Sequence, residues 1–207
     1  MKKLFIPLAF FLVLGASLYA GPFGLDFGMT LEQVKSVATI DKQSPTLDSI
    51  IPYVHWITPA KKSSYFDTYM IEISPQFGLF EIIASGNIIE SDEYGEKIRN
   101  EFNKVKDIIS QTYGPPTNES DYLKSGSIWS EPCDWLTALR KGERVYKTSW
   151  SVDDGLSLPA PLGVISLGIH FLYDNECYLE LDYQPTWFGD AVKDALNDAQ
   201  KEEKSVF

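Results

Sequence analysis

Residues 163–183 read GVISLGIHFLYDNECYLELDY, and the alternation in this stretch decides the fold. Before the Asp174–Asn175 turn every second side chain is apolar, and the same is true after it. Successive side chains of a strand point to opposite faces of a sheet, so the pattern predicts two strands that each have one buried face. The two apolar sets are Ile165, Leu167, Ile169, Phe171 and Tyr173, then Cys177, Leu179, Leu181 and Tyr183.

The register of this hairpin follows from the same alternation. Residues that lie opposite each other in an antiparallel pair share a face, so the two apolar sets coincide only when the loop has an odd number of residues. We therefore expect residues 174–176 to form the loop. The predicted pairs are Phe171/Leu179 and Ile169/Leu181 toward the core, and His170/Glu180 and Leu172/Tyr178 on the other side.

The rest of the chain repeats this plan of helices and alternating strands. Thr30 and Gln33 form a capping-box pattern before a short helix at 31–38. Apolar residues at helical spacing predict a long helix from Ser91 to Gly114, a short one after Pro132 and a last one at 187–203. The other predicted strands are 65–74, 79–89 and 144–152, with an edge strand at 53–57, and residues 118–120 are expected in a polar loop.

These elements predict the α+β class. Residues 21–207 form a single domain of two helix-plus-antiparallel-meander units, 21–90 and 91–207, which share a sheet with the helices packed on one face. The chain has 18 basic and 29 acidic residues and a net charge of −11. This charge argues against a protein that binds nucleic-acid phosphates.

The N-terminus has the pattern of an export signal. Lys2 and Lys3 precede the apolar run 4–14, and small residues follow up to Ala20. We expect residues 1–20 to be a signal peptide and the chain to be periplasmic or secreted, with no stable membrane insertion after cleavage. An uncleaved N-terminal anchor is the alternative. In an oxidising compartment Cys133 and Cys177 are expected to form a disulfide, and two separate buried thiols are the alternative.

Residues 28–34 read GMTLEQV, and this opening resembles that of the SmpA/OmlA-type outer-membrane-assembly lipoproteins. It is similar, more loosely, to the β-lactamase-inhibitor-like modules built from helix-plus-meander units. The chain differs from the lipoproteins because it has no lipid-acceptor cysteine near the signal region. The resemblance implies an envelope protein that binds another protein through one face of its sheet.

The sequence favours binding over catalysis. Its two histidines, His55 and His170, offer little choice for a hydrolase triad, and there is no Gly-x-Ser-x-Gly motif or glycine-rich phosphate loop. We predict no catalytic residues, no metal ligands and no cofactor. The residues on the sheet face opposite the helices are more apolar than an ordinary solvent-exposed surface and more acidic than a buried core. We therefore expect this face to bind another envelope protein. Its residues are Phe66, Met70, His170, Leu172, Tyr178, Glu180 and Asp182. The alternative is a small-ligand protein or enzyme with a pocket between the halves that uses His170 and Glu180.

Overall fold

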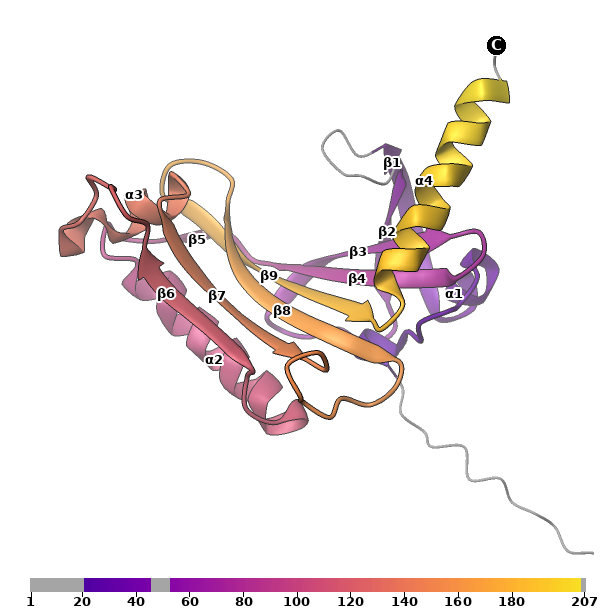
Figure 1. Cartoon of the computed structure of the whole chain (residues 1–207), viewed down its shortest axis with the longest axis horizontal. Coiled ribbons are helices and arrows are strands. Elements are labelled where there is room, and N and C mark those ends of the chain that lie inside the picture. Colours follow the sequence, from indigo (N-terminus) through magenta and orange to yellow (C-terminus); the bar gives the residue numbers. More distant parts are fainter. Residues whose placement is uncertain (1–20, 46–52, 206–207) are drawn as a thin grey trace, which may run out of the picture.

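The computed structural model describes residues 21–45 and 53–205 (Figure 1). The predicted signal peptide therefore lies outside the described residues. The strands are β1 (Ala38–Pro45), β2 (Tyr53–Pro59), β3 (Phe66–Ser74), β4 (Gly78–Gly86), β5 (Ile89–Glu90), β6 (Asn118–Leu123), β7 (Arg144–Ser151), β8 (Leu162–Phe171) and β9 (Glu176–Pro185). The α-helices are α1 (Leu31–Val37), α2 (Glu96–Tyr113), α3 (Trp135–Arg140) and α4 (Phe188–Ser205), with 3₁₀ turns at Pro22–Gly24 and Pro132–Asp134.

In the described part of the chain all strands belong to one antiparallel sheet in the order β1-β2-β3-β4-β9-β8-β7-β6, and β5 also pairs with β9. The α+β class with helices packed on a sheet is confirmed. The first four strands and the last four come from the two halves of the sequence. They join where β4 pairs with β9, with Ile83 opposite Asp182 and Ala84 opposite Leu181.

The local signals at the ends of α1 act as expected. The Gln33 backbone N–H donates to Thr30 Oγ1 at 3.3 Å, and the Thr30 backbone N–H donates to Gln33 Oε1 at 2.8 Å. This capping box satisfies two helix-end donors and fixes the direction in which a helix of 7 residues enters the fold. Val34 is fully buried, so a helix too short to persist alone is held by its packing.

Helix α2 packs its apolar stripe on the sheet. Ile98, Phe102, Val105 and Ile109 are all buried in the main core with the odd-numbered apolar residues of β8 and β9. The helix begins at Glu96, later than predicted, because Gly95 adopts a left-handed conformation with φ 70° just before it. Asp92 still contributes to the start, since its Oδ1 accepts a hydrogen bond from the Glu96 N–H at 2.8 Å.

The edges of the sheet differ from the prediction. Strand β1 was not expected, and it pairs with β2, so that β2 is an inner strand and not an edge. Residues 118–120 were expected in a loop, which is wrong, because they begin β6 and pair with β7 from Asn118 opposite Ser149 to Leu123 opposite Arg144. The β6 sequence NESDYL is polar on both faces, so only its pairing with a neighbour reveals it as a strand.

The hairpin of β8 and β9 keeps the predicted faces but not the predicted partners. Phe171 pairs with Cys177, Ile169 with Leu179 and His170 with Tyr178. Each partner lies two residues earlier along β9 than we expected. A shift of two residues preserves which side chains share a face, whereas a shift of one would have exchanged them. Leu167, Cys177, Leu179 and Leu181 are buried accordingly.

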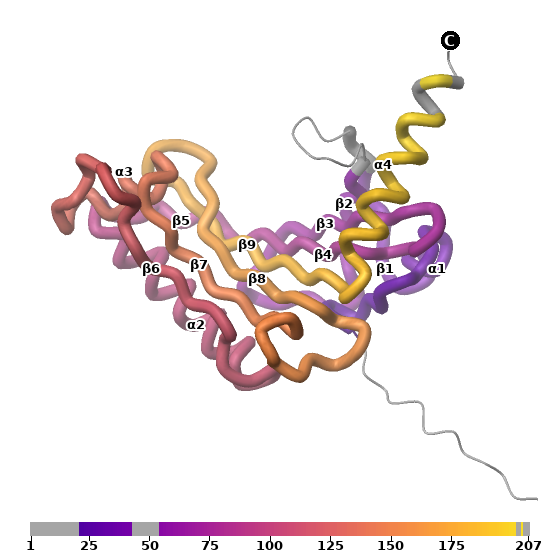
Figure 2. Tube along the Cα trace, in the orientation of Figure 1, coloured from indigo at the N-terminus to yellow at the C-terminus, as the bar shows by residue number. Residues whose placement is uncertain are grey.

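Helix α4 departs from the prediction that the helices cover one face. Figure 2 shows α2 and α4 on opposite sides of the sheet. Ala191 and Ala195 of α4 pack with Phe80 of β4 in a cluster separate from the main core. Asp194 Oδ2 also accepts a hydrogen bond from the backbone N–H of Gln76 at 2.9 Å. None of the helices in the described residues is long and apolar enough to cross a membrane.

Candidate functional site

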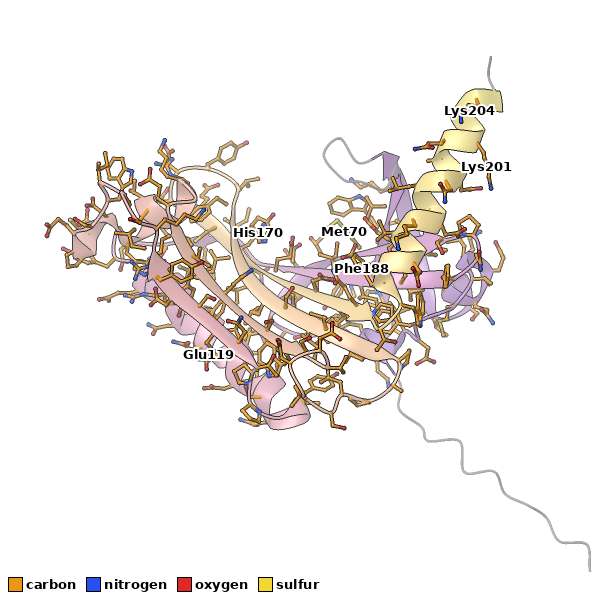
Figure 3. The ribbon with its side chains drawn as sticks, in the orientation of Figure 1. Met70, Glu119, His170, Phe188, Lys201 and Lys204 are labelled. Carbon is orange, nitrogen blue, oxygen red and sulfur yellow. The ribbon has the colours of Figure 1, made fainter. Side chains whose placement is uncertain are left out.

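The face of the sheet opposite α2 is covered by α4 beside the turn that joins β3 to β4, and the rest of this face is free of helices. We call it the open face. Its central residues are Met70, Glu72, Glu81, Ile83, Tyr178, Glu180, Asp182 and His170. In Figure 3, Met70 and His170 project from this face, and Phe188 lies at the base of α4 beside it. Six of the seven residues predicted to bind a partner lie here or at its rim.

His170, Tyr178 and Glu180 form one contact group on the open face. The His170 and Tyr178 rings stack with 5.7 Å between their centroids and 28° between their planes. His170 Nε2 lies 3.2 Å from Glu180 Oε1, so the predicted pair exists as a diagonal contact and not as directly opposed residues. The His170 side chain is 49% exposed, and Leu172 beyond it is also 49% exposed. Burial raises the pKa of the Tyr178 phenol, and the Glu180 charge adds to this effect.

Phe66 is not on the open face, which corrects the prediction. The pairing of β3 with β4 has an irregularity between Phe66 and Thr68, and this β-bulge exchanges the faces of the residues before it. Phe66 is consequently buried in the main core, where its ring meets Phe23 with 6.3 Å between centroids. Strict alternation counted back from Met70 could not detect the extra residue.

Glu72, Glu81 and Asp182 form a cluster of carboxyl groups that the sequence prediction did not assemble. Glu72 lies directly opposite Glu81, and Asp182 lies on the next strand opposite Ile83. The Gln184 amide joins two of them, because its Nε2 donates to Glu81 Oε1 at 2.8 Å and to Asp182 Oδ2 at 2.7 Å. Glu72 is 5% exposed and Glu81 is 9% exposed. We call these three acids the carboxyl cluster.

Burial and mutual repulsion favour the protonated forms of the three acids in the carboxyl cluster. Burial raises the pKa of Glu72 to about 9, with the Glu81 charge as the next cause. Burial also raises the pKa of Glu81, although its hydrogen bond from Gln184 works in the opposite direction. The pKa of Asp182 is raised by burial and by the charges of Glu81 and Glu180. Like charges this close together cannot all ionise in a poorly hydrated place, so the hydrogen bonds between these carboxyls need protons.

The local structure explains why Glu81 faces the same side as its neighbour Phe80. The β3–β4 ladder shifts register between Glu72 and Ile73, and Phe80 is the extra residue. Leu79 packs in the main core, whereas Phe80 packs under α4. A bulge of this kind re-aims side chains within a strand. The carboxyl cluster therefore has an apolar wall at its α4 end. Glu180, which shares a face of β9 with Asp182, is 24% exposed.

The predicted disulfide is wrong. Cys133 is exposed and Cys177 is buried, and both are free cysteines. The Cys177 thiol instead donates to the Ile89 carbonyl oxygen at 3.4 Å, and burial raises its pKa to about 11. The described residues contain no group of three or more His, Cys, Asp or Glu side chains arranged to hold a metal ion. The carboxyl cluster is therefore not such a group either.

A separate cleft of about 540 Å³ lies on the α2 side, between the two halves of the sequence. Its lining includes Tyr65 and Asn87 from the first half and Lys97, Asn100 and Lys104 from α2. Leu179 also lines it, close to the turn at Gly86 where β4 leaves the ladder. His170 and Glu180 are not among its lining residues, so this is not the pocket that the alternative prediction described.

Comparison with known proteins gave no relative that could identify the site. No protein-family model, curated protein or solved structure matches this chain. The residues of the open face are therefore the basis for assigning a function.

Proposed function

We propose that the chain is an exported, non-enzymatic protein that binds another protein of the cell envelope through its open face. The observation that carries the proposal is the group of half-exposed aromatic, apolar and acidic side chains on this face. Aromatic side chains such as Tyr178 are enriched at the centres of protein interfaces, and polar and charged side chains form the rim around them. The export part of the proposal is based on the sequence of residues 1–20.

The support is rigid because the open face is the reverse side of the main core. Each partly exposed residue of β9 has buried neighbours in the strand, such as Leu179 and Leu181 beside Glu180. A partner would meet aromatic area at Tyr178, adaptable apolar area at Met70 and an acidic edge at Glu180. On the adjoining strand β8, the small residue Ser166 lies opposite Asp182, and the His170 ring lies over Gly168.

The same geometry favours recognition over chemistry. The pair of His170 and Glu180 is a cross-strand contact at the protein surface. A general acid or base works best where water is excluded and the reacting group is held in place. The His170 ring also stacks on Tyr178, which suits a surface that another protein covers.

A photo-crosslinking experiment in the source cells tests this proposal. A benzophenone amino acid at Leu172 is expected to give a discrete crosslinked species, because this side chain stands at the rim of the open face. The matched control is Ile108 on α2, which is 45% exposed but lies on the opposite side of the sheet. Cell fractionation of the same strains tests export. A second probe at Met70 repeats the test within the open face. Equal crosslinking from Leu172 and Ile108, or no crosslinking from either Leu172 or Met70, would refute the proposed use of this face.

A second candidate function is supported by the cleft beside α2. Lys97 and Asn100 line one side of the helix and could hold a small organic anion, with Leu179 supplying an apolar wall. Lys104 also lines the cleft, where it is paired with Glu101 at 2.6 Å, so an anion would compete with this carboxylate. A thermal-shift screen of small carboxylates tests this candidate. Stabilisation that is lost in Lys97→Gln/Lys104→Gln but kept in Lys193→Gln, a lysine of α4, would support it. A screen without any stabilising carboxylate would count against it.

A further inference from the structure

The carboxyl cluster lacks an electrostatic partner within the described protein. The groups that act on its three acids are one another, Glu180 and the neutral Gln184 amide. The nearby charges are already engaged. On β8, His170 is in contact with Glu180; on α4, Asp194 accepts from Gln76, and Lys193 pairs with Asp190. On β1, Lys42 lies over the Trp56 ring of β2.

Asp182 shows what the cluster lacks. Its Oδ2 accepts from Gln184, but its Oδ1 is closed to solvent and no N–H or O–H of the described residues donates to it. The remaining neighbour is the Glu81 carboxyl, with which Asp182 forms a hydrogen bond only when one of the two carries a proton. A buried carboxyl oxygen without a donor is costly. This oxygen needs either a proton or a donor supplied from outside.

A guanidinium or ammonium group can supply that donor. Both carry several N–H groups and no acceptor, so they complement a group of acceptor oxygens in shape and charge. The route into the cluster is the Glu180 side, because Phe80 and α4 close the other end. Met70 and Tyr178 lie on the same face of the sheet as Glu180 and offer apolar area on which the stem of a long basic side chain can pack.

We propose that the open face binds a basic segment of its protein partner, and that an Arg or Lys side chain of this segment enters beside Glu180 and donates a hydrogen bond to Asp182 Oδ1. This inference rests on the proposed function and adds the chemistry of the partner. No covalent bond changes: the carboxylic acid O–H protons pass to the buffer, and the cation takes their place.

The linkage between cation and protons gives the proposal a distinctive signature. Since burial raises the pKa of Glu72 and of its two neighbours, the free protein holds protons at neutral pH that the complex releases. The affinity for the cation then increases with pH, by up to tenfold per pH unit for each proton released. A patch of ordinary exposed carboxylates is fully ionised at pH 6 and gives no such increase.

The test is isothermal titration calorimetry of the full mature chain with a hexa-arginine peptide in 150 mM salt, from pH 6.5 to pH 8.5. We expect the affinity to increase at least tenfold across this range. Titrations in buffers of different ionisation enthalpy are expected to show the release of about one proton per peptide bound. A peptide with citrulline in place of arginine has the same shape without the charge and is expected not to bind.

Matched variants separate the cluster from the overall negative charge. Glu72→Gln/Glu81→Gln/Asp182→Asn keeps neutral groups of the same shape and is expected to abolish both the binding and the proton release. Glu96→Gln/Asp107→Asn/Asp153→Asn replaces the same number of carboxyl groups at exposed positions elsewhere and is expected to retain both. Circular dichroism verifies that each variant is folded.

The outcomes distinguish this inference from the proposed function. Absence of peptide binding at every pH, a pH-independent affinity, or equal loss in both triple variants would overturn the inference. If crosslinking at Leu172 still gives a specific partner in any of these cases, the open face is an interface and only the chemistry assigned to it is wrong. If crosslinking also fails, the proposed function falls with it.

Discussion

Replacing Glu72 with Gln should stabilise the protein at neutral pH, although Glu72 is almost fully buried. The folded protein keeps this carboxyl protonated up to a pKa of about 9, whereas the unfolded chain releases the proton near 4.5. Between these values the folded state binds one more proton than the unfolded state. Its free energy of unfolding therefore decreases as the pH increases, by about 1.4 kcal/mol per pH unit.

The size of the effect follows from this difference. At pH 7 the chain is 2.5 pH units above the ordinary value of 4.5, so holding the proton on Glu72 costs about 3 kcal/mol. Gln has the shape of the protonated acid and can donate to Glu81 without binding a proton. Glu72→Gln is therefore expected to raise the free energy of unfolding at pH 7 by about 3 kcal/mol and to have no such effect at pH 4.5.

Urea denaturation followed by tryptophan fluorescence at several pH values from 4.5 to 8.5 measures this. The wild type should lose stability steadily as the pH increases, and the variant should show a slope that is smaller by about 1.4 kcal/mol per pH unit. Asp107→Asn, an exposed change on α2, should differ from wild type by less than about 0.5 kcal/mol at every pH. A variant that is less stable than wild type by the same amount at all pH values would show that Glu72 does not carry a proton in the folded state, and would refute the reasoning.

Three further predictions test the packing. Phe66→Ala should lower the free energy of unfolding by about 3–5 kcal/mol, since the ring is in the core and not on the open face. A decrease of less than about 1 kcal/mol would indicate that the ring is at the surface. Gly78→Ala should lower the free energy of unfolding more than Gly126→Ala in the same denaturation assay. Both glycines have positive φ, but a Cβ at Gly78 would lie 2.4 Å from the Gly28 carbonyl oxygen, whereas a Cβ at Gly126 would have no atom within 4 Å. A thiol reagent should label Cys133 at once and Cys177 only after denaturation, and a reductant should leave the melting temperature unchanged; a native protein without free thiols would contradict this.

The predictions that succeeded were those set by neighbours in the sequence. The Thr30–Gln33 capping box, the apolar stripe of α2 and the buried faces of β8 and β9 each depend on spacings within one element. The candidate site was predicted only in part, for the same reason. Tyr178, Glu180 and Asp182 share a face by alternation alone, and so their grouping was correct.

The predictions that failed needed information from other parts of the chain. Alternation placed Phe66 on the wrong face because a bulge depends on how two strands fit together. Strand β6 carries no apolar alternation and exists through its pairing with β7. The cysteines looked like a pair by their number, but one is buried in the core and the other is exposed.

The sequence by itself determined which side chains of α1, α2, β8 and β9 turn inward, because the backbone geometry of a regular element fixes that choice. Only the tertiary structure decided that β4 lies against β9, which brings Glu81 near Asp182 although they are about a hundred positions apart in the chain. Only it decided that α4 packs on Phe80 and closes one end of the open face. The physical reason is that strand order and helix docking depend on the total packing of distant segments, and a carboxyl group acquires an unusual proton affinity only from the neighbours that this packing supplies.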